Sequence, residues 1–290
     1  MNADDLRSRD DRQRVIRKLA RVALYLFLIA SSFFMLMPFL WMILSSFKSQ
    51  AELFLIPPRV FPIRWAFENY VYMWESAPWF RYFLNTTWVT VTTVIGQIVV
   101  CSMAGYAFAR LNFKGKKIVF MIYISTMMIP FHVIMIPQFI IVRDLGWFNS
   151  HNALIIPGIF GIFNVFGTFM MRQFFLTVPK ELEDAAKIDG CSYPRLYFEI
   201  FLKNAKPVIM TLVIFTFMHS WNDFLRPLIF LRNSDLWTLT MGIAKFQGTY
   251  VTQWNQLMAG SLITMIPVLI VFVFAQRYFI EGVVASGIKE

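Results

Sequence analysis

The sequence predicts an all-α, polytopic membrane protein with six transmembrane helices. Hydrophobic residues make up 58% of the chain and charged residues only 15%, whereas soluble domains carry about 25% charged residues. The mean hydropathy is +0.57. Six separate segments reach the roughly 20 apolar residues that a spanning helix needs. We place the spans at about 22–46, 82–107, 118–142, 153–176, 207–230 and 258–280.

Lysine and arginine are distributed unevenly between the segments that join the spans. Nineteen of the 27 lie before span one, after span two, or at and beyond the ends of spans four and six. Loops rich in these residues remain in the cytoplasm. We therefore expect a cytoplasmic N-terminal tail (1–21), a cytoplasmic loop at about 177–206 and a cytoplasmic C-terminal tail (281–290). The net charge of +10 follows this flanking pattern instead of one basic patch, so nucleic acid is not expected as a partner.

The longest loop on the other side runs from about Phe47 to Trp79 and is rich in proline and aromatic residues. Aromatic residues near span ends usually anchor at the lipid interface. We expect amphipathic or irregular surface structure here, and docking of an external partner is the alternative. Several spans contain prolines, which predict kinks that either suit a change of shape or only set packing angles: Pro38, Pro130, Pro137, Pro157 and Pro267.

A charged stretch, PKELEDAAKIDGCS, lies between spans four and five. Pro179 suits a helix start and Gly190 a helix end. A second short helix should follow from Ser192 with Pro194 in its first turn, and Pro207 should open the next span. Two adjacent alanines, Ala185 and Ala186, should leave the surface of the first helix low. Asp184 and Asp189 then flank that low spot with negative charge.

This stretch resembles the coupling-loop motif of ABC importer membrane subunits in the carbohydrate-uptake group, similar to the maltose and glycerol-phosphate permeases. The family pattern is Pro-Lys-Glu-Leu-Glu-Glu-Ala-Ala-x-Ile-Asp-Gly-Ala-Ser. Asp184 stands where the family has the second glutamate of its Glu-Glu pair. Cys191 stands where the family has the alanine after its glycine. The family's later Leu-Pro is Leu202-Lys203 here. Weaker resemblances lie at 106–111, 128–130, 221–225 and 276–279.

The resemblance implies an ABC importer type I permease fold and a place in the bacterial inner (cytoplasmic) membrane. The chain would be the permease subunit of an ATP-driven, binding-protein-dependent carbohydrate importer that works by alternating access. Expected partners are a second homologous permease subunit in a heterodimer, two copies of a cytoplasmic ATPase, an extracytoplasmic solute-binding protein and the lipid bilayer. The positions expected to couple to the ATPase are Glu183, Asp184, Ala185, Ala186, Asp189 and Gly190.

The sequence contains no catalytic motif. The fragment Lys114-Gly115-Lys116-Lys117 lacks the first glycine and the Ser or Thr of a P-loop. The chain is therefore not expected to be an enzyme or to bind a cofactor, and ATP and Mg should be bound by partner ATPase subunits. Two distant cysteines and three histidines show no metal-ligand spacing.

Polar residues at membrane depth are the candidates for the substrate pathway: Gln97, Asn164, Asn222 and Asp223. Each has an alternative role as an interhelical hydrogen-bonding or interfacial capping residue. Asp223 and Arg226 have the spacing of a helical ion pair, which we favour over direct contact with a sugar.

Other functions remain open from the sequence. The same class of importer would also accept glycerol phosphate or an acidic saccharide as substrate. An ion-coupled secondary transporter working alone would need central charges and internal repeats, and few central charges and no evident repeat are present. A membrane scaffold without transport activity is the third hypothesis.

Overall fold

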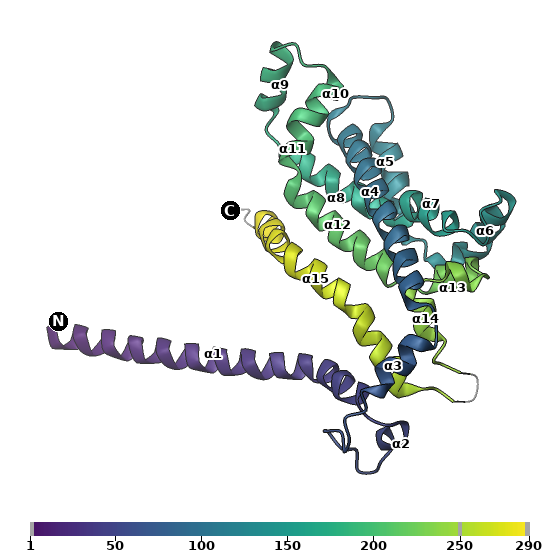
Figure 1. Cartoon of the computed structure of the whole chain (residues 1–290). Helices are drawn as coiled ribbons and strands as arrows, with labels where there is room; N and C mark the ends of the chain where they lie inside the picture. Colours follow the sequence, from purple (N-terminus) through teal and green to yellow (C-terminus); the bar gives the residue numbers. More distant parts are fainter. Residues whose placement is uncertain (1–2, 249–250, 288–290) are drawn as a thin grey trace. The chain divides into compact units, whose positions relative to one another are not determined.

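The computed structural model describes residues 3–248 and 251–287, and its elements are helices (Figure 1). Four helices are long and apolar enough to cross a membrane: Ile16–Ser46, Trp79–Arg110, Asn152–Thr177 and Trp254–Phe274. Two further helix pairs are bent, and counting each pair as one span gives up to six. The all-α class is therefore confirmed for the described residues, with four to six spans.

The chain divides into two compact units. Unit 1 comprises Met1–Met73 and Thr249–Leu262, and unit 2 comprises Trp74–Gly248 and Ile263–Glu290. Helix α15 (Trp254–Gly287) begins in unit 1 and continues into unit 2. It contains the predicted sixth span and part of the predicted C-terminal tail, of which residues 288–290 lie outside the described residues.

Unit 1 is dominated by helix α1 (Ala3–Ser46), which joins the predicted N-terminal tail and the first span in one helix. None of the most apolar window of α1 is buried within the chain. Helix α2 (Gln50–Leu53) and the start of α3 (Glu68–Glu75) follow. The apolar surface of α1 is thus available to lipid along most of its length, as expected of a spanning helix.

Helix α4 (Trp79–Arg110) is the centre of unit 2. It packs against α7 (Asn152–Phe160), α8 (Ile162–Thr177), α12 (Lys206–Trp221) and α14 (Leu239–Ala244). Its buried residues recur every three or four positions and form one helical face: Tyr82, Thr86, Val89, Thr90, Thr93, Gln97, Cys101 and Gly105.

Glycines allow α4 and its neighbours to approach closely. A Cβ at Gly105 would lie 2.7 Å from the Cβ of Met171, and a Cβ at Gly167 would lie 2.6 Å from the Sγ of Cys101. Small residues at the contact between membrane helices let the two backbones approach each other and pack closely.

The predicted third span, 118–142, is not one continuous helix. Helix α5 (Lys116–Ser125) and the 3-10 turn η1 (Thr126–Met128) are followed by α6 (Phe131–Asp144), and the pair is bent by 102°. Pro130 is the cap residue of α6, and the residue before it has extended backbone. A proline disfavours helical geometry in the residue before it, which explains the break.

The predicted fifth span, 207–230, is also interrupted. Helix α12 ends at Trp221 and α13 covers Leu225–Phe230. Before α12, helix α10 (Tyr193–Leu196), the π-helical segment η2 (Tyr197–Phe201) and α11 (Leu202–Asn204) form one arm, bent by 76° from α12. Pro207 lies in the first turn of α12, as predicted.

The fourth span is divided into α7 and α8 at Gly161. A Cβ at this position would lie 2.3 Å from the carbonyl oxygen of Pro157, so only glycine fits the break. The short turn η3 (Ser234–Leu236) belongs to the loop between α13 and α14.

Candidate functional site

The charged stretch forms helix α9 (Lys180–Ile188), labelled in Figure 1. Pro179 is the cap residue at its start, and Glu181 and Glu183 lie in its first turn, where acids interact favourably with the helix dipole. At its end, Gly190 has a φ of 78°. The amide groups of Gly190 and Cys191 donate to the carbonyl groups of Lys187 and Ala186 at 3.0 and 2.9 Å. This is the Schellman ending that favours glycine, so both predicted ends of the helix are confirmed.

The predicted coupling residues lie on two sides of the helix. Those at the surface are Asp184, Ala185, Asp189 and Gly190. Glu183 and Ala186 face the interior of the chain and are only 8% and 9% exposed. The expectation that both alanines lower the surface is therefore wrong for Ala186, because one turn of helix places it beside the buried Glu183.

The exposed face of α9 also carries two large apolar residues that the sequence analysis did not select. Leu182 is 49% exposed and Ile188 is 87% exposed. They lie three residues before and after Ala185, and this spacing places all three on one face of the helix. The spacing was visible in the sequence and would have identified them. We call Leu182, Ala185 and Ile188 the α9 face.

Glu183 anchors the inner side of α9. Its Oε1 accepts a hydrogen bond from the Nζ of Lys187 at 2.7 Å, and its Oε2 lies 3.5 Å from the Nη1 of Arg110. The Arg110 and Glu183 side chains are only 6% and 10% exposed. The hydrogen bond that Lys187 donates to Glu183 raises the pKa of Lys187, so this amino group remains charged at physiological pH.

Arg110, the last residue of α4, connects four elements. Its Nε and Nη2 donate to the carbonyl oxygen of Phe175 on α8 at 3.0 and 2.5 Å, and Nη2 also donates to the carbonyl oxygen of Val178. The guanidinium lies 4.9 Å from the ring centroid of Phe201 in η2. From the sequence, Arg110 was assigned only to a family-like segment and to the basic residues after span two, and not to an anchoring role. The available signal was its position: an arginine at the end of an apolar span needs acceptors for its hydrogen bonds where it is buried.

The arm after α9 is joined to α4 by aromatic contacts. The ring centroid of Tyr106 lies 5.0 Å from that of Phe201 and 5.3 Å from that of Tyr197. The hydroxyl groups of Tyr197 and Ser102 are 2.7 Å apart. Closely packed rings of this kind transmit displacement because the interior has few voids. The arm and α4 are therefore tightly packed against each other.

Two of the four residues predicted for the substrate pathway lie between helices instead. Gln97 is fully buried, and its Nε2 donates to the carbonyl oxygen of Gly158 at 2.7 Å. Asn164 is 3% exposed, and its Oδ1 accepts from the hydroxyl of Tyr123 at 2.5 Å. Both satisfy their polar atoms by interhelical hydrogen bonds, which is the alternative role named from the sequence. Their place in the substrate pathway stays a prediction.

The other two residues lie where α12 ends. Asn222 is exposed, and its Nδ2 donates to the carbonyl oxygen of Met218 at 2.9 Å. The Oδ2 of Asp223 accepts from the Nε of Arg226 at 2.6 Å, which confirms the predicted ion pair. Both partners are mostly buried, with side-chain exposures of 15% and 11%.

A cavity of about 1110 Å³ lies in unit 2 between the bent third span and helices α7, α8, α12 and α13. Asp223 and Arg226 lie on its wall, whereas Gln97 and Asn164 do not. The imidazole of His219 stacks on the ring of Phe163, with centroids 4.4 Å apart. The wall is otherwise mainly aromatic and aliphatic and includes Tyr123, Phe131, Trp147, Phe160, Phe166 and Phe215.

Metal binding has no support in the described part of the chain, where no group of three or more His, Cys, Asp or Glu residues could hold an ion. Cys101 is buried and hydrogen-bonded to the Oε1 of Gln97 at 3.0 Å, in agreement with a packing role.

Comparison with known proteins agrees with the motif resemblance. Residues 97–284 match the family of binding-protein-dependent transport system inner membrane components. The arabinooligosaccharides transport system permease protein AraQ of Halalkalibacterium halodurans is 36% identical over 261 residues, which cover 89% of this chain and 92% of that protein.

Two crystal structures share the fold. A bacterial ABC transporter involved in the import of the acidic polysaccharide alginate contains a chain with a TM-score of 0.76 and 22% identity, covering 92% of this chain and 97% of that one. A bacterial alginate ABC transporter in complex with an alginate pentasaccharide-bound periplasmic protein gives a TM-score of 0.64 and 13% identity, covering 91% and 96%. The chain belongs to the family of binding-protein-dependent transport system inner membrane components, among which it resembles the carbohydrate-uptake ABC permeases.

Proposed function

We propose that the chain is the permease subunit of an ATP-driven, binding-protein-dependent importer of a sugar or oligosaccharide. The main observation that supports this proposal is the α9 face. It exposes apolar residues flanked by two carboxylates, while Arg110 and Glu183 fix the opposite side of the helix to α4 and α8. A helix held in this way can accept force from a partner and pass it to the spans.

The expected mechanism is alternating access. Two copies of a cytoplasmic ATPase, which bind ATP and Mg, would close on each other and displace α9. The displacement would pass through Arg110 and the rings around Tyr106 into α4 and α8 as a rigid-body movement. The chain itself would contribute binding surfaces and no catalytic group, so it is not an enzyme under this proposal.

The proposed assembly contains a second homologous permease subunit, in a heterodimer, and an extracytoplasmic solute-binding protein. Family membership supports both partners, and one solved relative is in complex with a periplasmic protein. The chain would lie in the bacterial inner membrane with both termini in the cytoplasm. The distribution of Lys and Arg supports this orientation.

The cavity in unit 2 is the proposed substrate pathway of this subunit. Exposed aromatic faces such as that of Phe160 suit the apolar faces of sugar rings, while His219 offers a hydrogen-bonding nitrogen and the Asp223–Arg226 pair a charged wall. AraQ supports an oligosaccharide as the substrate class. Gln97 and Asn164 would position α4 and α8 around the pathway without touching the substrate.

The function is tested by reconstituting the chain with its partner permease, ATPase and binding protein in proteoliposomes. ATP hydrolysis that rises with the loaded binding protein, together with ATP-dependent sugar uptake, is the expected result. Uptake by the chain alone, driven by an ion gradient without ATP, would instead establish a secondary transporter.

The variant Ala185→Arg places a bulky cation in the α9 face. It should abolish the uptake that the loaded solute-binding protein stimulates, while the complex still inserts in the membrane. Lys180→Arg puts the same side chain on the flank of the same helix and serves as the matched control. Normal uptake by Ala185→Arg would show that the α9 face does not couple the ATPase to the spans.

A further inference from the structure

The loop that follows α1 exposes an unusual amount of apolar surface. Between Leu53 and Phe67, eight large apolar side chains are exposed: Phe54, Leu55, Ile56, Val60, Phe61, Ile63, Trp65 and Phe67. Ile56 is 96% exposed and Phe61 is 70% exposed. Soluble proteins rarely expose so many large apolar side chains within one short segment unless something covers them.

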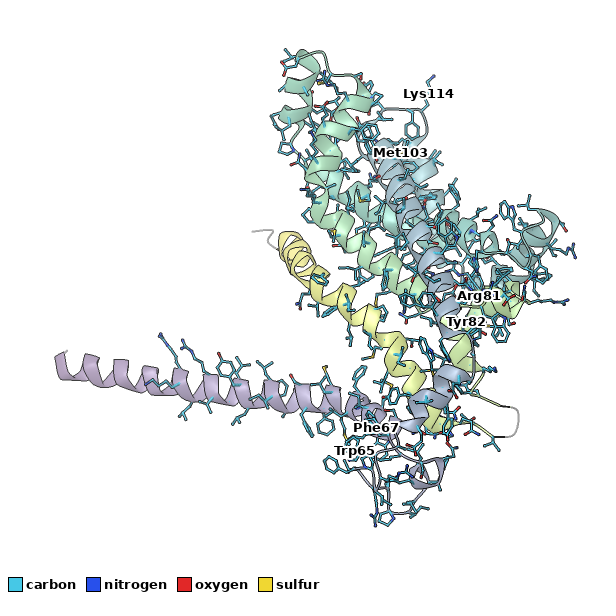
Figure 2. The ribbon with its side chains drawn as sticks, viewed as in Figure 1. Trp65, Phe67, Arg81, Tyr82, Met103 and Lys114 are labelled. Atoms are coloured by element: carbon cyan, nitrogen blue, oxygen red, sulfur yellow. The ribbon has the colours of Figure 1, made fainter. Side chains whose placement is uncertain are left out.

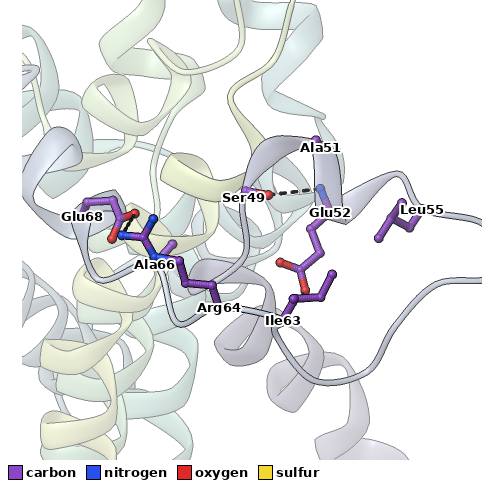
Figure 3. Close-up of a pocket in the computed structure, with 8 residues that line it drawn as sticks. All are labelled: Ser49, Ala51, Glu52, Leu55, Ile63, Arg64, Ala66 and Glu68. Carbon is purple, nitrogen blue, oxygen red and sulfur yellow. Dashed lines mark hydrogen bonds and ion pairs between the residues drawn. The ribbon is translucent and has the colours of Figure 1, made fainter.

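This loop is held together by buried polar groups, so its conformation is specified. The Nζ of Lys48 donates to the carbonyl oxygen of Arg59 at 2.6 Å, and the amide of Ile63 donates to the Oε1 of Glu52 at 2.5 Å. Lys48 is 1% exposed and Glu52 is 7% exposed. Figure 3 shows Glu52 beside Ile63, with the Oγ of Ser49 capping the amide of Glu52.

The base of the loop is closed at the end of α1. The amide of Ala66 donates to the carbonyl oxygen of Phe47 at 2.8 Å. The ring centroid of Phe47 lies 5.3 Å from that of Trp65 and 5.2 Å from that of Phe67. Trp65 and Phe67 therefore remain beside the end of α1 (Figure 2). These contacts hold the base of the loop, and the large apolar side chains from Phe54 to Phe67 remain exposed on its outer side.

We propose that residues 53–67 form an interfacial anchor that lies in the headgroup region of the lipid bilayer. The loop lies close after α1, with only the short helix α2 between them, and the apolar side chains of α1 are exposed as in a spanning helix. The loop therefore emerges at the membrane surface. It carries Trp65, and tryptophan concentrates at this depth of the bilayer.

The charges of the loop complement lipid phosphates. Arg59 is exposed, and the side chain of Arg64 is 82% exposed even though its Nη2 lies 3.2 Å from Glu68. Arginine side chains can extend to phosphate oxygens while the neighbouring apolar residues enter the acyl boundary. The combination of apolar, aromatic and basic residues favours a lipid surface over a purely apolar protein partner.

The experiment uses the complete importer in nanodiscs of phosphatidylethanolamine and phosphatidylglycerol. In a Cys191→Ser background, the variants Ile56→Cys and Phe61→Cys are labelled with an environment-sensitive fluorophore. Phe34→Cys, 76% exposed on α1, is the control within the membrane. Ser234→Cys, exposed in the loop after α13, is the control in water. Quenching is measured with iodide and with lipids that carry a nitroxide near the headgroup or near the chain end.

We expect the labels at Ile56 and Phe61 to be quenched most by the nitroxide near the headgroup, with or without the binding protein. Phe34 should respond most to the deep nitroxide and Ser234 only to iodide. Iodide quenching of the Ile56 and Phe61 labels equal to that of Ser234 would place the loop in water and overturn the proposal. Protection from both iodide and lipid nitroxides would show that a protein subunit covers the loop, which would also overturn it.

Discussion

Arg110 is the residue on which the placement of α9 depends most. Replacing it with glutamine removes the positive charge that pairs with Glu183. It also removes the guanidinium that donates to the carbonyl oxygens of Phe175 and Val178. Hydrogen bonds to charged groups contribute about 1.5–3 kcal/mol each, so we expect Arg110→Gln to lower the opening free energy of α9 by about 2–3 kcal/mol. Hydrogen exchange of the amides in 180–188 measures this.

Lys114→Gln is the control for that variant, because it removes a cation from an exposed position in the next loop (labelled in Figure 2). Exchange in 180–188 should be the same as in the parent chain. Equal exchange for Arg110→Gln and Lys114→Gln would mean that Arg110 does not hold α9.

Gly105 is a second residue with a specific requirement. A Cβ there would lie 3.0 Å from the backbone nitrogen of Arg172 as well as against Met171, and backbone cannot move aside as a side-chain end can. Overpacking of this kind costs about 1–3 kcal/mol. We expect Gly105→Ala to lower the thermal unfolding midpoint of the purified complex.

Met103→Ala changes an outward-facing residue on the same helix, 55% exposed, and should leave that midpoint nearly unchanged. If both variants have the same midpoint as the parent chain, the close packing of α4 on α8 does not limit stability.

The sequence predicted those residues whose role is local. Pro179 and Gly190 act through the backbone of their own helix, and their positions as start and end of α9 were readable from residue type alone. The direction of Ala186 and the partners of Gln97 and Asn164 depend on how separate helices pack, which no local pattern contains. Arg110 was missed as an anchor for the same reason, because its acceptors are 65 to 73 residues away in the chain.

At the scale of elements, a side chain added at the end of α9 would strain the backbone without causing a steric clash. Gly190 has a φ of 78°, and no atom lies within 4 Å of a Cβ built on it. The left-handed conformation costs most L-residues about 1–2 kcal/mol. Asparagine adopts this conformation more readily than other L-residues do. We expect Gly190→Val to uncouple ATP hydrolysis from uptake and Gly190→Asn to retain most coupling, measured as sugar imported per ATP hydrolysed. Equal coupling in the two variants would argue against a role for the geometry of this turn.

The spans show where periodicity and length stop being informative. Apolar content predicted six segments, and the described residues contain four to six candidate spans. Apolar content could not show that the third segment bends by 102° or that the fifth is interrupted before Leu225. Pro130 signalled the first break. Nothing so clear marks the second, where Asn222 and Asp223 end α12 through polar contacts with the carbonyl of Met218 and with Arg226.

At the scale of the whole molecule, the orientation in the membrane decides whether the α9 face can meet an ATPase. The two native cysteines test it without further substitution at the site. Cys191 follows α9 and is partly exposed, whereas Cys101 is buried. A membrane-impermeant maleimide should therefore label Cys191 in inside-out vesicles and not in right-side-out vesicles. Added ATPase should slow this reaction, because Cys191 adjoins the end of the α9 face.

Ser234→Cys provides the opposite control, since it is exposed in the loop between the predicted fifth and sixth spans. It should react only in right-side-out vesicles. Labelling of Cys191 from the outer side would place α9 away from the cytoplasm. The exposed Ile188 would then have no nucleotide-hydrolysing partner within reach, and the distribution of Lys and Arg would have to reflect something other than orientation.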